Sequence, residues 1–499
     1  MSKVFIFTQT YNSEKVLRRA VESILGQTHT DFTYMITDNA STDKTRCLIE
    51  EYARNDRRII ARFEEDNDRS RFVDNALECA TKNEEGWWCL LDHDDEYEAR
   101  FLENTLEFAK SNNLDIAAAG TAFFDGITGQ RTSEGYFIPD DLVISGSGFA
   151  RYLQIYAQFA HVIWNKIFSL SVLKKCSAEA KKAFIGVDTI FTYEAFSYAK
   201  RVGILGGTLH KYFVMPTSWS SEFDIKRIQS NEMVFENMLG YLHKRNACSI
   251  ENRSICYSTY ILSLKHSLSA LTQSEWASLE KLNAIRDMFA ISHTTTSYGY
   301  KLVSASAREL QRNAQNYILS VPEALEEDYF EVIIEIFGYM QDVFVKPKWD
   351  DADLFKLFAA IRLKYFEKKG EYPSLDDKIK DIISNSSILS QSQLTPSISV
   401  FMADIVFDVL RASWQEALDK AIKLLDDEIP HDCIDAFLTL SQNIAAIAEN
   451  SEIYIYFKKI WTSYLIDCGR NDDAKMELDY FLKILPHDED FIGLNQRIS

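Results

Sequence analysis

Residues 87–96 read Trp-Trp-Cys-Leu-Leu-Asp-His-Asp-Asp-Glu, an apolar run that passes directly into four acidic side chains. The run predicts a buried β-strand that ends near Leu91. Carboxylates crowded at the end of a strand repel one another unless a cation or hydrogen-bond donors compensate them, and hard divalent cations prefer such oxygen ligands. The segment therefore indicates a site for Mg²⁺ or Mn²⁺ that carries a phosphorylated ligand, and a solvated acidic loop is the alternative.

Short β-rich runs alternate with amphipathic stretches on both sides of this segment, up to about residue 220. Strands are expected at 4–7, 32–36, 59–63 and 87–91, and helices around 14–25, 42–54 and 71–82. This alternation is typical of an α/β fold with a parallel sheet and crossover helices. Right-handed crossovers bring the carboxyl ends of successive strands to one edge of the sheet, where ligands usually bind.

A second predicted strand also ends in an aspartate. Residues 34–43 read Tyr-Met-Ile-Thr-Asp-Asn-Ala-Ser-Thr-Asp, and Asp38 follows the apolar part directly. Ser41 or Thr42 is suited to cap the helix that follows. Taken alone, the segment is equally typical of an ordinary strand-to-helix turn.

The chain changes character from about residue 225. Thirteen of the 18 glycines lie before residue 241. The second half consists of long segments with a 3.6-residue apolar period, at 235–244, 257–271, 329–345 and 354–368. We expect a sheet domain over residues 1–225 and an all-α domain over residues 226–499, with a sub-boundary near 370–400. Residues 454–485 resemble one tetratricopeptide-type helix pair, although no second copy is evident at a fixed period.

Composition and charge disfavour several classes of partner. The 54 Lys and Arg against 74 Asp and Glu give a net charge of −20, which repels nucleic-acid phosphates and anionic lipid headgroups. The eight cysteines occur singly, without a CxxC pair, as expected for reduced thiols. No apolar stretch approaches the roughly 18 residues that a membrane span needs, and the apolar run at 4–7 is too short for a signal peptide. We expect a cytoplasmic protein with no nucleic-acid partner and no transmembrane segment.

Several motifs, in a fixed order, resemble those of the family 2 glycosyltransferases of the GT-A fold. Residues 8–12, Thr-Gln-Thr-Tyr-Asn, are similar to the family's first-strand motif, and residues 23–28, Ser-Ile-Leu-Gly-Gln-Thr, to the end of its first helix. Residues 38–43 resemble its Asp-Asp-Gly-Ser-Thr-Asp loop, with asparagine and alanine in place of the second aspartate and the glycine.

Three further segments continue the resemblance. Residues 92–95, Asp-His-Asp-Asp, look like the family's metal motif, and residues 164–168, Trp-Asn-Lys-Ile-Phe, look like a segment near its acceptor side. Residues 186–189, Gly-Val-Asp-Thr, resemble the motif that carries the catalytic base. The resemblance covers roughly residues 1–220 and implies a GT-A type, mostly parallel sheet flanked by helices.

The resemblance implies a donor site for a nucleotide-diphosphate sugar. Thr8 belongs to the first-strand motif, and Tyr11 and Asp38 would contact the nucleotide base, typically the imide of a uracil. A donor phosphate would meet Arg71 or Arg69, which lie in a segment that keeps the family pattern poorly. The donor is therefore expected to be a UDP-sugar.

The same resemblance implies a metal-dependent hexosyltransferase. Asp92 would hold the ribose or the waters of the metal, and Asp94 would ligate Mn²⁺ or Mg²⁺ between the donor phosphates. The cation would neutralise the leaving diphosphate as the glycosidic bond breaks. His210 lies in a region that often closes over the donor in this fold, so it is a candidate metal or diphosphate contact, and a structural histidine is the alternative.

On the acceptor side, the resemblance implies that Asp188 is the general base of a single inverting displacement. The alternative is that Asp188 only caps the helix that follows it. Asn165 lies in the acceptor segment, and Trp164 and Trp219 are candidates to stack on a sugar face, with packing in the protein as the alternative. The acceptor is expected to be a glycan, a glycoprotein or a lipid-linked glycan.

Two other functions fit parts of the sequence. A nucleotidyltransferase would also use strand-end carboxylates and a cation, but residues 9–13 lack the glycine-rich phosphate loop that it needs. A non-catalytic helical scaffold with a degenerate transferase domain is the second alternative, which the poorly kept segment at 67–75 favours. The helical half is a candidate surface for a protein partner or for oligomer formation.

Overall fold

The computed structural model describes residues 3–215, 223–292, 304–321 and 451–498, with isolated positions between 329 and 339. They fall into two compact units. The first covers residues 1–276 and 300–310, and the second covers residues 277–299 and 311–499. The expected helix at 354–368, most of that at 329–345 and the sub-boundary near 370–400 lie outside the described residues. The domain boundary near residue 225 stays a prediction.

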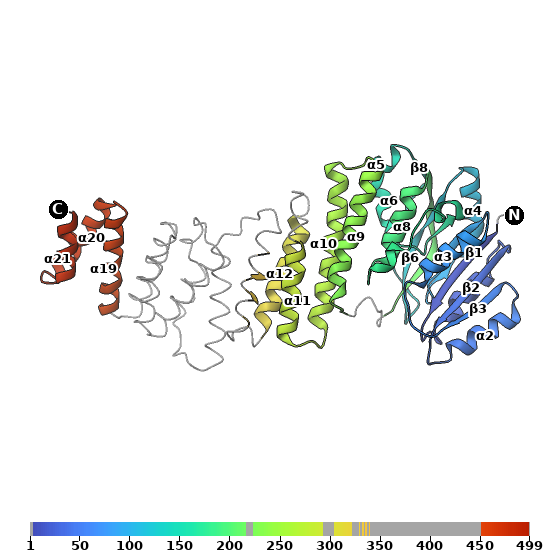
Figure 1. The fold of residues 1–499 in the computed structure, drawn as a ribbon, viewed down its shortest axis with the longest axis horizontal. Helices are drawn as coiled ribbons and strands as arrows, with labels where there is room; N and C mark the ends of the chain where they lie inside the picture. Colours follow the sequence, from blue (N-terminus) through green and yellow to red (C-terminus); the bar gives the residue numbers. More distant parts are fainter. Residues whose placement is uncertain are drawn as a thin grey trace. The chain divides into compact units, whose positions relative to one another are not determined.

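Four parallel strands form one half of the sheet in the first unit (Figure 1). They are β1 (Val4–Thr10), β2 (Phe32–Asn39), β3 (Ile59–Glu64) and β4 (Trp87–Leu90), in the order β3-β2-β1-β4. Helices α1 (Leu17–Leu25), α2 (Thr45–Asn55) and α3 (Arg71–Lys82) connect them. The strands and helices expected in this region are confirmed, because their apolar residues recur with the periods of buried strands and amphipathic helices.

The other half of the sheet is mixed. β4 pairs antiparallel with β9 (Lys166–Ser169), β9 pairs antiparallel with β6 (Ile116–Asp125), and β6 pairs parallel with β10 (Arg201–Val214). Three further strands extend it: β5 (Glu96–Tyr97) and β8 (Leu142–Ser145) pair with β10, and β7 (Arg131–Tyr136) pairs with β6. The longest ladders of this sheet are parallel, which confirms the predicted α/β class.

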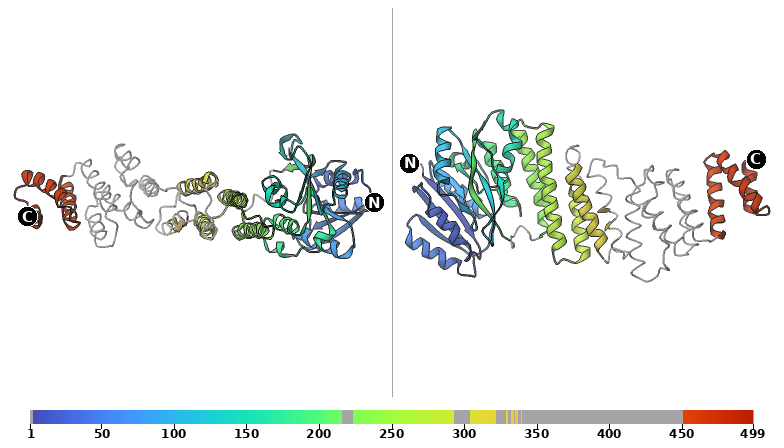
Figure 2. Two further views of the ribbon diagram at one scale, coloured as in Figure 1. Left: turned by 90° about the horizontal axis from the view of Figure 1, so that it is seen from above. Right: turned by 180° about the vertical axis from the view of Figure 1, so that it is seen from behind.

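Helices cover both faces of the sheet (Figure 2). Side chains alternate along β1, so Val4 and Ile6 pack with Leu17 of α1 and with Phe101 of α4 (Phe101–Ser111), while Phe7 points to the face that α3 covers. All of these side chains are buried. A sheet buried on both faces is rigid, so its strand ends hold the loops that follow them in fixed positions.

Seven further helices among the described residues belong to the first unit. They are α5 (Gly148–Arg151), α6 (Leu153–Ala160), α7 (Leu170–Leu173), the 3₁₀ helix η1 (Glu179–Lys182), α8 (Val187–Tyr198), α9 (Lys226–Lys244) and α10 (Ile250–Gln273). Tyr241 of α9 packs its ring 5.1 Å from that of Tyr193 in α8, and its hydroxyl lies 2.7 Å from that of Tyr156 in α6. These buried aromatic contacts join α9 to the sheet domain.

The described part of the second unit is helical, as predicted. It contains α11 (Ser278–Ser292), α19 (Ser451–Asp467), α20 (Asn471–Ile484) and α21 (Glu489–Ile498), while α12 (Ser304–Ser320) crosses the division between the units. The pair expected at 454–485 corresponds to α19 and α20. Within the described ranges, no helix has the length and apolar character to cross a membrane.

Candidate active site

The carboxyl ends of β1, β2 and β4 lie at one edge of the sheet because these strands are parallel. Thr10 of β1 lies in register with Asp38 of β2. Between them and β4, the fully buried Thr8 donates a 2.7 Å hydrogen bond to the Leu91 carbonyl and accepts one of 3.0 Å from the Tyr34 hydroxyl. Thr8 therefore links the strands internally, and its contact with a donor stays a prediction.

The loops after β1 and β2 are bonded to each other. The Asn12 N–H donates to the Ser41 hydroxyl at 2.8 Å, and the Asn12 side-chain oxygen accepts from the Thr42 N–H at 2.8 Å. Tyr11 in the first loop is 43% exposed, whereas Asp38 is 2% exposed, with both carboxylate oxygens 3.3 Å from the Ser41 N–H. The edge thus offers an exposed aromatic ring and a buried carboxylate, both predicted contacts of a nucleotide base.

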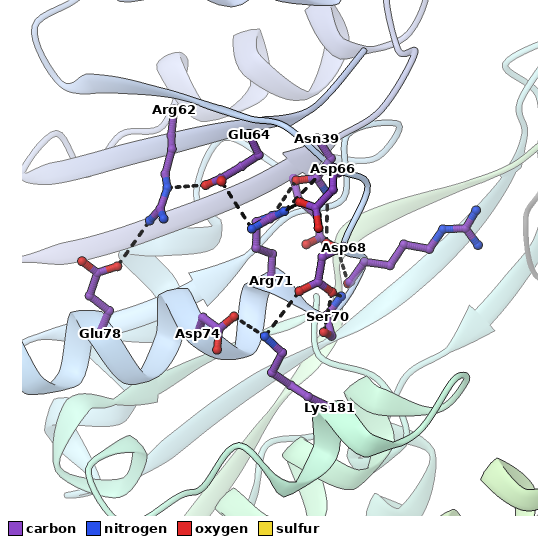
Figure 3. A network of polar contacts seen from close by, with 12 residues as sticks. Asn39, Arg62, Glu64, Asp66, Asp68, Ser70, Arg71, Asp74, Glu78 and Lys181 are labelled. Carbon is purple, nitrogen blue, oxygen red and sulfur yellow. Dashed lines mark hydrogen bonds and ion pairs between the residues drawn. The ribbon is translucent and has the colours of Figure 1, made fainter.

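Arg71 lies in a network of charged side chains at the start of α3 (Figure 3). Its Nε donates to Asn39 Oδ1 at 3.1 Å, and its guanidinium forms ion pairs with Glu64, at 3.4 Å, and with Asp66. The Asn39 amide also donates to the Asp68 carbonyl at 3.1 Å, which an aspartate could not do when ionised. A donor phosphate would therefore compete with two carboxylates for Arg71.

The acidic run after β4 forms a tight turn. The Asp95 N–H donates to the Asp92 carbonyl at 3.2 Å, and the fully buried Asp95 carboxylate accepts the Phe213 N–H at 2.9 Å. Burial and the charges of Asp94 and Asp188 raise the pKa of the Asp92 carboxyl to about 8. Burial and the same run of carboxylates also raise the pKa of Asp95 well above its usual range. The carboxylates of this turn therefore have too few hydrogen-bond donors and positive charges around them to balance their negative charge.

This excess charge fits a hard divalent cation. Asp92 and Asp94 are half-buried, and no hydrogen bond or ion pair within the described ranges engages the Asp94 carboxylate. No three His, Cys, Asp or Glu side chains among the described residues are arranged to hold a metal ion. Mg²⁺ in proteins commonly takes one or two carboxylates and completes its shell with waters and substrate phosphates. The turn therefore suits a cation that binds together with a diphosphate.

Asp188 lies in the first turn of α8, where Gly186 is the N-cap with a φ of +70°. The alternative that Asp188 is itself the N-cap is therefore wrong. Burial raises the pKa of the Asp188 carboxyl to about 6, against the opposing effects of the Thr189 N–H and the Lys166 charge. The Asp188 charge also contributes to the raised pKa of Asp92, after burial and the Asp94 charge.

Lys166 is a buried lysine with no role among the predictions from the sequence, and burial lowers its pKa well below the usual range, against the opposing charge of Asp188. Its ammonium is fully buried and donates to Asn165 Oδ1 at 2.6 Å and to the Val162 carbonyl. The Thr192 hydroxyl, one helical turn after Asp188, donates to the same Val162 carbonyl at 3.3 Å. Lys166 and the face of α8 that carries Asp188 thus both donate hydrogen bonds to the Val162 carbonyl. The signal in the sequence was a lysine directly before the apolar pair Ile167 and Phe168 of β9.

Trp164 and His210 pack against each other inside the domain. Their rings lie 4.4 Å apart at 23°, Trp164 is 7% exposed, and His210 is fully buried with its Nε2 3.3 Å from Asp95 Oδ2. Burial and the Lys166 charge lower the pKa of His210 well below its usual range. The metal contact of His210 and the sugar contact of Trp164 stay predictions, and Trp219 lies outside the described residues.

Known proteins match the part of the chain that carries the loops after β1 and β2 and the acidic turn after β4. The model of the family described as "Glycosyl transferase family 2" matches residues 5–163. The putative teichuronic acid biosynthesis glycosyltransferase TuaG of Bacillus subtilis (strain 168) is 31% identical over 118 residues, which are 23% of this chain and 46% of TuaG.

A second relative and a solved structure extend the comparison. The uncharacterized glycosyltransferase YibD of Escherichia coli (strain K12) is 24% identical over 224 residues, which are 44% of this chain and 63% of YibD. The match thus spans less than two thirds of TuaG and of YibD. The crystal structure of S. aureus TarS is 16% identical, with a TM-score of 0.43, over 65% of this chain and 55% of TarS.

Proposed function

We propose that the N-terminal domain, whose residues 5–163 belong to glycosyl transferase family 2, transfers a sugar from a nucleotide-diphosphate donor to an acceptor hydroxyl with inversion. One observation carries this proposal. Asp188 of α8 is distant in the sequence from the acidic turn after β4, yet the segment before β9 contacts both regions. The Val162 carbonyl accepts a hydrogen bond from Thr192 of α8, and the Trp164 ring packs on His210, whose Nε2 lies 3.3 Å from Asp95. These contacts support a diphosphate site and a base that lie close together.

The base of the nucleotide would bind at the carboxyl ends of β1 and β2. The exposed Tyr11 ring offers a stacking surface, and the buried Asp38 carboxylate can accept the imide N–H of a uracil. A buried carboxylate that accepts one backbone N–H retains lone pairs for a ligand. This pairing favours a UDP-sugar as the donor.

The diphosphate would bind beside the turn after β4. Asp94 and Asp92 would hold Mn²⁺ or Mg²⁺ there, and the cation when bound neutralises the charge that develops on the leaving diphosphate. Arg71 would contact a phosphate after exchanging one of its carboxylate partners, Glu64 or Asp66. The exposed Asp66 side chain is the partner that can be displaced at lower cost, since water can solvate it.

Asp188 would act as the general base. The acceptor oxygen attacks the anomeric carbon, the bond from that carbon to the diphosphate oxygen breaks, and the acceptor proton passes to the Asp188 carboxylate. A pKa of about 6 leaves Asp188 ionised near neutral pH yet basic enough to take this proton. One displacement of this kind inverts the anomeric configuration.

The acceptor would approach from the side of α8 and the segment at 164–168. Trp164, Asn165 and Trp219 remain our proposed acceptor contacts, and His210 a proposed contact of the metal. A glycan, a glycoprotein or a lipid-linked glycan is the proposed acceptor class, with the helical unit as a surface for a protein partner or oligomer. The proposed compartment is the cytoplasm.

Product analysis tests the function directly. The full chain is incubated with a panel of UDP- and GDP-sugars and candidate glycan acceptors, with Mn²⁺ or with excess chelator, and products are separated by mass spectrometry. Release of UDP with Mn²⁺ supports the proposal, whereas formation of UTP and a sugar 1-phosphate from a UDP-sugar and added pyrophosphate would indicate a nucleotidyltransferase. Binding of nucleotides without turnover of any donor would favour the non-catalytic scaffold.

A further inference from the structure

The guanidinium of Arg19, in α1, reaches the acidic turn from the helix before β2. It donates a hydrogen bond to the backbone carbonyl of Asp94, and its Nε lies 3.8 Å from a carboxylate oxygen of Glu96. Its central carbon lies 3.5 Å from the ring centroid of Phe213 in β10. One side chain thus contacts the turn, β5 and β10.

We propose that Arg19 is a positioning residue for the metal site, which fixes the Asp94–Asp95 peptide and thereby the direction in which the Asp94 carboxylate points. This inference rests on the proposed function, because it assumes that Asp94 binds the cation of the donor complex. Arg19 itself contacts neither the cation nor the sugar, and it acts through the backbone that carries Asp94.

The peptide between Asp94 and Asp95 is planar, so its two polar groups turn together. Arg19 bonds the carbonyl of this peptide, and the Asp92 carbonyl accepts its N–H at 3.2 Å. With both groups engaged, the peptide plane cannot rotate without breaking a hydrogen bond. The Cα–Cβ bond of Asp94 then has one direction, while its carboxylate stays without a hydrogen bond or ion pair among the described residues.

Arg19 also supplies positive charge where carboxylates gather. Its guanidinium bonds the Asp94 carbonyl and lies 3.8 Å from the Glu96 carboxylate, so a positive charge stands within the run of acidic side chains. Without Arg19, the turn would keep its carboxylates and lose this counter-charge. The resulting repulsion favours movement of the turn toward solvent, which would spread the carboxylates and weaken their convergence on one cation.

The contact with Phe213 suits arginine and not lysine. A planar guanidinium stacks on an aromatic ring while its N–H groups donate in the ring plane, whereas an ammonium has no flat face. Phe213 is itself fixed, since its N–H donates to Asp95 at 2.9 Å and its ring stacks on Phe124 at 5.3 Å and 27°. Arg19→Lys should therefore keep the positive charge but fail to hold the Asp94–Asp95 peptide in its position.

Arg18 provides a matched control on the same helix. Its side chain is 57% exposed, it forms an ion pair with Glu22 at 3.7 Å, and it lies 5.6 Å from the Tyr52 ring centroid. Arg18→Met thus removes an arginine, an ion pair and a ring contact from α1, as Arg19→Met does, without touching the acidic turn.

The test measures UDP binding by calorimetry over a series of Mn²⁺ concentrations, with circular dichroism to verify folding. We expect Arg19→Met to raise the Mn²⁺ concentration at half-maximal UDP binding by roughly 10- to 100-fold, as for other losses of support around a metal ligand. Arg19→Lys should raise this half-maximal Mn²⁺ concentration by at least about threefold, and Arg18→Met should leave it at the wild-type value. Asp94→Ala serves as the reference for complete loss of the Mn²⁺-dependent part of UDP binding.

Each outcome decides the matter. Wild-type Mn²⁺ dependence in folded Arg19→Met would overturn the positioning role and leave the proposed function intact. Should Arg19→Met fail to fold, Arg19→Lys decides, and a wild-type Mn²⁺ dependence in that variant overturns the role. UDP binding by the wild type that ignores Mn²⁺ would overturn both the metal-dependent function and this inference.

Discussion

Replacing Asp188 by asparagine should lower turnover and at the same time stabilise the protein. Asparagine has nearly the shape of aspartate and still accepts a hydrogen bond from the N–H of Thr189, but it cannot take a proton from an acceptor. General-base assistance is worth about 10²- to 10⁴-fold, so turnover should fall by that factor. UDP affinity should stay within about twofold, since the base acts only in the transition state.

The gain in stability follows from the pKa of this carboxyl. Asp188 has a pKa of about 6 in the folded protein against 3.8 for an ordinary aspartate, so folding favours its neutral form. Its contribution to stability is greatest below pH 3.8 and falls as the pH rises to about 6. About two pKa units correspond to about 3 kcal/mol, which the ionised carboxylate removes from the free energy of unfolding above its pKa.

The amide that Asp188→Asn introduces is never charged, so this loss disappears in the variant. The variant also loses the attraction between a carboxylate and the amino end of α8, which is worth about 0.3–1 kcal/mol. We therefore expect the free energy of unfolding at about pH 7.5 to rise by about 1–3 kcal/mol, and the difference between variant and wild type to shrink toward about pH 4.

Urea unfolding from about pH 4 to about pH 7.5 and steady-state product release measure the two effects on the same preparations. Glu194→Gln is the matched control, because Glu194 is a half-buried carboxylate of α8 that accepts hydrogen bonds from Ser177. Its turnover should match the wild type. Near-normal turnover of Asp188→Asn would place the base elsewhere, lost UDP binding would place this residue in the nucleotide site, and reduced stability would refute the electrostatic argument.

Asp94→Ala should abolish Mn²⁺-dependent UDP binding and transfer while leaving the melting temperature nearly unchanged, and full activity in excess chelator would contradict the metal role. Lys166→Met should shift the acid limb of the pH–rate profile above its wild-type midpoint at about pH 6, because the Lys166 charge lowers the pKa of Asp188; an unchanged limb would refute this coupling. Gly186→Ala should cost about 1–3 kcal/mol in urea unfolding, since its φ is +70° and a Cβ would lie 2.5 Å from a valine methyl of α9. The control Gly129→Ala, with a φ of +67° and open space around it, should cost less, and equal losses would refute the packing term.

Local patterns in the sequence determined the first four strands, the three helices between them and the residue types at the strand ends. The apolar run at 87–91 predicted β4, which is confirmed, and the acidic residues after it predicted crowded carboxylates, which the structure places in one tight turn. The strand ending at Asp38 and the three connecting helices also follow from residues that are neighbours in the chain. Periodicity and residue type are local properties, so a sequence reports them directly.

Only the tertiary structure decided which distant groups meet. Lys166 shares a carbonyl with the face of α8 that carries Asp188, Arg19 reaches the carbonyl of Asp94 across 75 residues, and Arg71 is held by carboxylates instead of facing solvent. The sequence contains no periodic signal for such pairs, because their proximity depends on how strands are ordered in the sheet and where helices cross it. The effect of the Lys166 charge on the pKa of Asp188 has the same origin, since burial by the surrounding fold removes the water that would otherwise screen the interaction.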